Sequence, residues 1–217
     1  MVDAAYAALK KAILESSFAP GYHASEQEIA LRLGMSRTPV HEAVIRLQED
    51  GLVRVLSRRG VLICALALED MREIYDVIIA VEGRAAELLA SLPDAERGSV
   101  AAELASETEA MARAWKDSDL PAWGQADARF HRALVERARN GRMTRIVQTI
   151  NDQSHRARML TLKLRRELGS SVAEHRAVIK AIQRGEPAEA QIHIHDHRLR
   201  ARDELLPILE SFGLTHL

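Results

Sequence analysis

The sequence after about residue 68 repeats its apolar side chains at steps of three and four, almost to its C-terminal end. This spacing is typical of amphipathic helices. The pattern is interrupted at Pro93, near Ser118, at Asn140 and Gly141, at Gly169 and at Gly185. The expected helices span residues 69–91, 94–116, 119–138, 142–167, 171–184 and 187–211. Because aromatic residues make up 4% of the chain, these helices must pack through aliphatic side chains, and we expect an all-helical bundle.

The first 66 residues carry shorter elements. A helix is expected over residues 4–15, and a second one over SEQEIALRLG, residues 25–34. In the second helix, Ser25 and Glu28 form a capping-box pattern, and Gly34 can supply a left-handed stop. A third helix, MSRTPVHEAVIRLQEDG, follows at once, and its proline is tolerated only in the first turn. The next stretch, LVRVLSRRGVLICAL, changes period around a basic tip and predicts a two-stranded hairpin.

Two helices joined by a tight turn, with a helix before and a hairpin after, are typical of a winged helix-turn-helix. In that arrangement the second helix of the pair enters the major groove, and its N-terminal residues reach base edges and phosphates. The candidate contacts are Ser36, Arg37, Thr38 and His41 on the helix, with Arg58 and Arg59 at the hairpin tip. The alternative interpretation is a small helical domain whose arginines are simply solvated.

Composition limits the other classes of protein. The chain has 30 basic and 31 acidic residues, so a DNA-binding surface has to be local rather than a property of the overall charge. The single cysteine, Cys64, excludes an internal disulfide and a cysteine-based zinc site, and it fits a reducing cytoplasm. Since no run of about 20 apolar residues is present, we expect no membrane span.

Polar residues lie on the apolar stripes of three of the expected helices. Asp127 and His131 are four residues apart in QADARFHRAL and share the stripe of its phenylalanine and leucine. His175 and His197 lie on the inward stripes of the last two helices. A buried carboxylate is costly unless it is paired or coordinated, so the pattern predicts a cationic partner or a metal beside Asp127.

The other histidines of the region have weaker claims to the same site. His195 points nearly opposite to the inward stripe of its helix, and His193 lies at the margin of that stripe as a second-choice ligand. His155 could reach a pocket, but the pattern around it does not define its helical phase.

One aspartate and three histidines on three helices can form a mixed oxygen and nitrogen site for Zn, Ni, Fe or Mn, with positions open for water or an anion. Taken singly, each histidine is more often a hydrogen-bonded core residue than a ligand. A metal-dependent hydrolase or lyase is a rival interpretation, but the sequence offers no second inward carboxylate as a general base. A third possibility is a purely structural metal in a DNA-binding protein.

The first 60 or so residues resemble the N-terminal domain of the GntR family of bacterial transcription regulators. The resemblance rests on AIL, APG, SEQEIALRLGMSRTPV and LQEDGLV. It implies a winged helix-turn-helix that acts as a homodimer on a pseudo-palindromic operator. The implied DNA contacts are Arg37 with Ser36 and Thr38, then Gln27 and position 41, with Gly60 at the turn of the wing. This motif usually has arginine at position 41, so His41 bears on operator preference.

The remainder resembles the all-helical ligand-binding domain called FCD, found in the FadR subfamily. DARFHRAL, EHRAVIKAI and GEPAEAQIHIHDH carry this resemblance. It implies a divalent metal held by Asp127, His131, His175 and His197, and it selects His197 over His193 and His195. The family often has an arginine facing the effector pocket at the position of Ile78. Arg84, Arg156 and Arg158 are candidate substitutes for effector binding, unless they are exposed, solvated arginines.

We therefore expect a mainly α protein, with a winged helix-turn-helix DNA-binding domain at residues 1–66 and an FCD-type helical domain that binds metal and effector at residues 67–217. The expected function is that of a cytoplasmic transcription regulator, a repressor rather than an enzyme. A small organic acid bound at the metal would control its binding to operator DNA.

Overall fold

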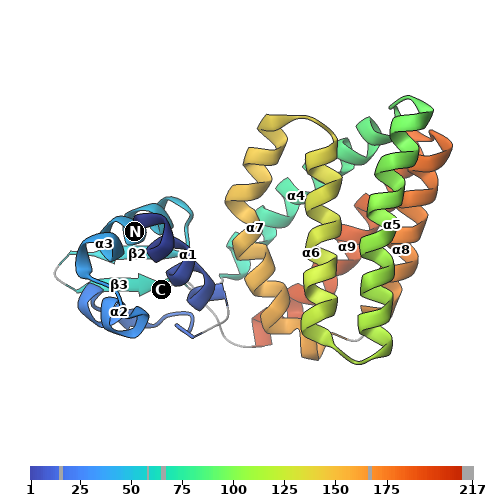
Figure 1. Ribbon diagram of the computed structural model, residues 1–217. Helices are drawn as coiled ribbons and strands as arrows, with labels where there is room; N and C mark the ends of the chain where they lie inside the picture. Colours follow the sequence, from blue (N-terminus) through green and yellow to red (C-terminus); the bar gives the residue numbers. More distant parts are fainter. Residues whose placement is uncertain (15–16, 58, 65–66, 166–167, 212–217) are drawn as a thin grey trace.

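The computed structural model describes residues 1–14, 17–57, 59–64, 67–165 and 168–211. Figure 1 shows a small part with short helices and strands on one side and a bundle of long helices on the other. The mainly helical architecture predicted from the apolar spacing is therefore confirmed. No helix of the described residues is long and apolar enough to cross a membrane.

The small part contains the predicted pair of helices and the turn between them. Its elements are α1 (Val2–Leu14), β1 (His23–Ala24), α2 (Glu26–Leu33), α3 (Arg37–Glu49), β2 (Val53–Leu56) and β3 (Gly60–Ile63). The Oγ of Ser25 accepts a hydrogen bond from the backbone N–H of Glu28 at 3.1 Å and caps α2. Gly34 ends the same helix with a φ of 65°. Both ends of α2 thus follow from local chemistry.

The predicted hairpin is present, but the prediction omitted a third strand of the sheet. Among the described residues, β1 pairs antiparallel with β3, which also pairs antiparallel with β2, so the strand order is β1-β3-β2. Gly60 begins β3 with a φ of 88°, and a Cβ there would lie 2.5 Å from the carbonyl oxygen of Ala24. Since β1 has two residues, it is too short for apolar alternation to reveal it.

Buried aliphatic residues from all three helices hold the small part together. They include Leu9 and Ile13 of α1, Ile29 of α2, and Val44 and Leu47 of α3, which pack against Val61 and Ile63 of the sheet. One face of α3 packs on this core, and the opposite face of the helix is exposed to solvent.

The bundle consists of α4 (Leu68–Ala90), α5 (Asp94–Lys116), α6 (Leu120–Arg137), α7 (Gly141–Thr161), α8 (Leu168–Arg184) and α9 (Pro187–Ser211). The expected helix 142–167 is too long: α7 passes into a 3₁₀ turn at Leu162–Leu164, and residues 166–167 lie outside the described part. The helix expected from residue 171 begins earlier and includes Gly169. Leu168 is buried in the same apolar cluster as Trp123, so packing outweighs the weak helix propensity of glycine.

One helix of the bundle, α7, contacts the small part directly, and Figure 1 shows it on that side of the bundle. The Nζ of Lys10 in α1 lies 2.5 Å from a carboxylate oxygen of Asp152 in α7. One turn further along α7, the Nη1 of Arg156 donates to the carbonyl oxygen of Cys64 at 2.8 Å. Polar contacts of α7 thus join the two parts, in addition to the chain itself.

Candidate metal centre and DNA-binding surface

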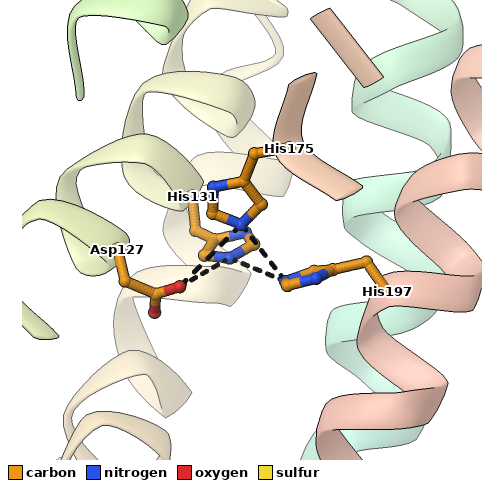
Figure 2. A group of neighbouring side chains, drawn as sticks. All are labelled: Asp127, His131, His175 and His197. Atoms are coloured by element: carbon orange, nitrogen blue, oxygen red, sulfur yellow. Dashed lines mark hydrogen bonds and ion pairs between the residues drawn. The ribbon is translucent and has the colours of Figure 1, made fainter. Parts of the chain in front are cut away.

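Four polar side chains meet inside the bundle, as Figure 2 shows. They are Asp127 and His131 of α6, His175 of α8 and His197 of α9, and each offers a ligand atom within 4.8 Å of the others. The Nε2 of His197 lies 3.2 Å from that of His131 and 3.3 Å from that of His175. All four residues are buried, at most 4% exposed, as their helical phase predicts.

The local sequence explains why these side chains converge. Asp127 and His131 are one helical turn apart, so both project from the same face of α6, and Asp127 Oδ1 lies 3.5 Å from His131 Nε2. The ring of His175 stacks on Phe130 with centroids 3.8 Å apart and an interplanar angle of 9°. The shared face of α6 and the stacking of His175 on Phe130 thus direct these ligand atoms toward one another.

The outer nitrogens of two rings contact carboxylates. The Nδ1 of His131 lies 3.0 Å from Glu82, and the Nδ1 of His197 lies 2.6 Å from Glu174. An ionised carboxylate only accepts hydrogen bonds, so each Nδ1 carries the proton and donates it. With the proton on Nδ1, Nε2 is the ring nitrogen left to bind a cation, and the Nε2 atoms of His131 and His197 lie 3.2 Å apart.

The protonation states of the cluster favour a bound cation. Burial would raise the pKa of Asp127, but the charges of His131 and Arg158 hold it well below its usual range. Burial, with the nearby His197 and His131, holds the pKa of His175 well below its usual range. Burial also lowers the pKa of His197 to about 4, although its hydrogen bond with Glu174 opposes that effect.

An ionised carboxylate and neutral imidazoles are the forms that bind divalent metals. The converging Nε2 lone pairs repel one another unless a proton or a cation lies between them. The residues of the cluster therefore fit a divalent cation.

A buried ion pair that the sequence did not reveal lies beside the cluster. Glu82 of α4 is 1% exposed, and Arg198 of α9 donates to both of its oxygens, at 2.7 Å from Nε and 2.5 Å from Nη2. Glu82 is thus a second inward carboxylate, but its oxygens are bound by Arg198 and His131, so it is not positioned as a general base. Glu82 follows Ile78 by four residues on the buried stripe of α4, and that spacing could have revealed it.

The three candidate effector arginines lie in different places. Arg84 is exposed and pairs with Glu87 on the same helix, so it is not part of the cluster. Arg156 is buried at the contact with Cys64. Arg158 is buried, and its Nη1 lies 3.5 Å from Asp127 Oδ2. The alternative of exposed, solvated arginines is therefore wrong for Arg156 and Arg158.

The other residues singled out around the ligand site lie outside the four-residue group. His193 and His195 contact Glu189 and Asp196 near the surface, with side chains 40% and 48% exposed. His155 is partly buried, and burial together with Arg158 lowers its pKa to about 4. Ile78 is buried in an apolar cluster.

Four of the candidate DNA contacts lie at the exposed N-terminal end of α3: Ser36, Arg37, Thr38 and His41. Gln27 is also exposed, but it lies in the first turn of α2. Ser36 is the N-cap of α3, but its side chain makes no capping hydrogen bond, which leaves the hydroxyl available to a ligand. The Nδ1 of His41 lies 2.8 Å from Glu26, and this hydrogen bond raises the pKa of the imidazole.

Two of the candidate wing residues, Arg59 and Gly60, lie at the turn between β2 and β3. Arg59 is exposed there, and Gly60 adopts the positive φ that the turn requires. Arg58 lies outside the described residues.

Comparison with known proteins supports both parts of the chain. The family model "Bacterial regulatory proteins, gntR family" matches residues 1–63, and the model "FCD domain" matches residues 73–200. An HTH-type transcriptional regulator of Agrobacterium vitis, in the TAR-I ttuE-ttuC' intergenic region, is 55% identical over 134 residues, which are 62% of this chain and 78% of that protein.

Solved structures share the fold. The McbR/YncC protein of E. coli superposes with a TM-score of 0.79 at 17% identity, covering 98% of both chains. A GntR transcriptional regulator of Rhodococcus sp. RHA1 superposes with a TM-score of 0.75 at 22% identity, covering 95% of this chain and 97% of that one. The chain therefore belongs to the GntR family of bacterial regulatory proteins, in its FCD-containing group, and is a DNA-binding transcriptional regulator.

Proposed function

We propose that this protein is a homodimeric repressor whose binding to a pseudo-palindromic operator is controlled by a small organic acid at a divalent metal. In this proposal, residues 1–66 bind DNA and residues 67–217 bind the metal and the acid. The observation that carries it is the buried convergence of Asp127, His131, His175 and His197 within a domain that contacts the DNA-binding part through α7. Repression follows because a dimer seated on operator DNA excludes other proteins from that stretch.

The donor atoms favour Zn, Ni, Fe or Mn, because imidazole nitrogen and carboxylate oxygen suit these divalent metals. A bound divalent cation would supply Lewis-acid attraction for the oxygen atoms of an anionic ligand. Asp127 and three neutral imidazoles supply one formal negative charge, so a metal dication would leave the centre positive and attractive to a carboxylate.

Arg158 is the most suitable protein group for an acidic effector. Its guanidinium is buried beside Asp127, and its Nη2 has no hydrogen-bond partner within the described part of the chain. A buried N–H without a partner is costly, and a carboxylate oxygen would satisfy it. Arg156 and Arg84 lie away from the cluster and are weaker candidates.

Helix α7 offers a route from this centre to the DNA-binding part. Arg158 contacts Asp127 of the cluster, whereas Asp152 and Arg156 contact Lys10 and the carbonyl of Cys64. A ligand that draws Arg158 toward itself would move the helix that also fixes the small part. Such a shift would alter the separation of two DNA-binding domains in a dimer, and half-site spacing makes operator affinity sensitive to that separation.

The test is a titration of small organic acids into metal-loaded protein bound to a DNA fragment that the protein itself selects from a random pool. We expect one class of acid to lower the affinity for DNA at least fivefold, the low end of ordinary allosteric coupling. If no acid changes the affinity while the metal stays fully loaded, the ligand switch is rejected.

A purely structural metal is a second candidate, because all four ligands are almost fully buried. His175→Ala would then lower thermal stability yet leave the binding of the organic acid intact at a temperature where the variant is folded. An enzymatic role has less support. Glu82 is an inward carboxylate, but its oxygens are already bound by Arg198 and His131, so it is not free to act as a general base.

A further inference from the structure

We propose that Glu82 and Glu174 are positioning residues that fix the orientation and donor nitrogen of His131 and His197, and thereby set the affinity of the centre for its metal. This inference rests on the proposed metal site and concerns residues outside the ligand set. Metal-bound histidines commonly donate their other ring nitrogen to a carboxylate, which increases their strength as ligands.

Glu82 is held so that one oxygen faces His131. Its Oε2 lies 3.0 Å from His131 Nδ1 and accepts from the Nε of Arg198 at 2.7 Å, while its Oε1 accepts from Arg198 Nη2. The two hydrogen bonds from Arg198 fix the carboxylate, so that it cannot rotate away from the ring.

Glu174 performs the same task for His197 from a partly buried position. Its Oε2 lies 2.6 Å from His197 Nδ1, and Arg200 donates to both of its oxygens from Nε and Nη2. Arg200 Nη2 also donates to the Oγ of Ser171, one turn earlier on α8. The guanidinium and the hydroxyl together fix the carboxylate against the ring.

Residues next to a ligand in the sequence support a different ligand on another helix. Glu174 directly precedes the ligand His175 in α8, yet it supports His197 of α9. Arg198 directly follows the ligand His197, yet through Glu82 of α4 it supports His131 of α6. The sequences EHR and HDHRLR therefore carry both ligands and supports, and the centre joins four helices.

The third ring is held differently. The Nδ1 of His175 has no hydrogen-bond partner among the residues that the structure describes, and the ring stacks on Phe130 instead. The proposal therefore predicts an asymmetric centre, in which two imidazoles are strengthened by carboxylates and one is oriented by packing.

The experiment compares Glu82→Gln and Glu174→Gln in the full-length protein with a matched control, Glu107→Gln. Glutamine keeps the shape and can still accept a hydrogen bond, but it removes the negative charge. Glu107 of α5 pairs with Arg129 of α6 at 2.8 Å and contacts none of the ligands. We expect zinc affinity, measured by competition with a chelator, to fall about 10- to 100-fold in the first two variants and to change less than twofold in the control.

Cobalt(II) provides the readout that a merely structural role would not change. At saturating cobalt, we expect the visible absorption bands of Glu174→Gln to be shifted relative to the wild type, and those of Glu107→Gln to coincide with it. Glu82→Gln leaves the buried Arg198 without its counter-charge and can fail to fold; the decision then rests on Glu174→Gln, whose partner is partly exposed. Wild-type affinity and spectrum in Glu174→Gln, or an equal loss in the control, would overturn the proposal. Absence of metal binding by the wild type would instead contradict the proposed metal site.

Discussion

At the scale of single residues, position on a helix separates the ligand cluster from the other histidines. His197 is buried and its Nε2 faces two other rings, whereas His195, two residues earlier, is 48% exposed and contacts Asp196. Two residues in a helix turn a side chain by about 200°, so neighbours in HIHDH reach opposite environments. The chemistry of a histidine in this chain is therefore decided by its helical phase.

The N-terminal residue of α3 gives the first prediction. Arg37→Ala should weaken binding to the selected DNA fragment by about 1–3 kcal/mol, because an exposed arginine at that point can bind a guanine edge with two hydrogen bonds. Fluorescence anisotropy at fixed salt measures the change. Arg184→Ala is the control, because Arg184 is exposed at the end of α8, and its affinity should match the wild type. Equal affinity of Arg37→Ala and the wild type would place DNA recognition elsewhere.

At the scale of the element, the wing depends on one glycine. Gly60→Ala combines a positive φ with a Cβ only 2.5 Å from the backbone oxygen of Ala24, so β1 and β3 would have to separate. We expect the free energy of unfolding to fall by more than about 2 kcal/mol, beyond the usual cost of left-handed strain alone.

Gly34→Ala is the matched control for the wing. Gly34 also has a positive φ, but a Cβ there has no atom within 4 Å, so only the conformational cost of about 1–2 kcal/mol applies. Urea unfolding followed by circular dichroism compares the two variants. Equal losses of unfolding free energy in the two variants would mean that the Cβ of Gly60→Ala causes no steric cost against β1.

The elements also show what the sequence can and cannot predict. Apolar spacing located the long helices and the inward direction of Asp127 and His175, because a helix ties side-chain direction to sequence position. It missed β1, since two residues carry no period. It also missed the pairing of Glu82 with Arg198, which are 116 residues apart and meet only because α4 packs along α9. The choice of His197 over His193 came from family resemblance.

At the scale of the whole molecule, α7 connects the two parts. The ion pair between Lys10 and Asp152 is the contact most easily tested, because each residue can be replaced by a neutral one of similar size. A double-mutant cycle with Lys10→Met and Asp152→Asn should give a coupling free energy of about 0.5–1 kcal/mol, since the pair is only partly buried. Chemical denaturation provides the unfolding free energies. Strictly additive effects of the two substitutions would contradict a stabilising ion pair between α1 and α7.

The whole account depends on a metal held by Asp127 and three histidines, and elemental analysis tests this most directly. The full-length protein is incubated with a divalent metal, and the unbound metal is then removed. The wild type and the control His195→Ala should each contain one ion per chain. His197→Ala should contain almost none. Chelation should lower the melting temperature of the wild type by roughly 5–10 °C if the metal had been present at about 100 times its Kd, and should leave His197→Ala unchanged. Wild-type protein without metal, or a full complement of metal in His197→Ala, would contradict the account.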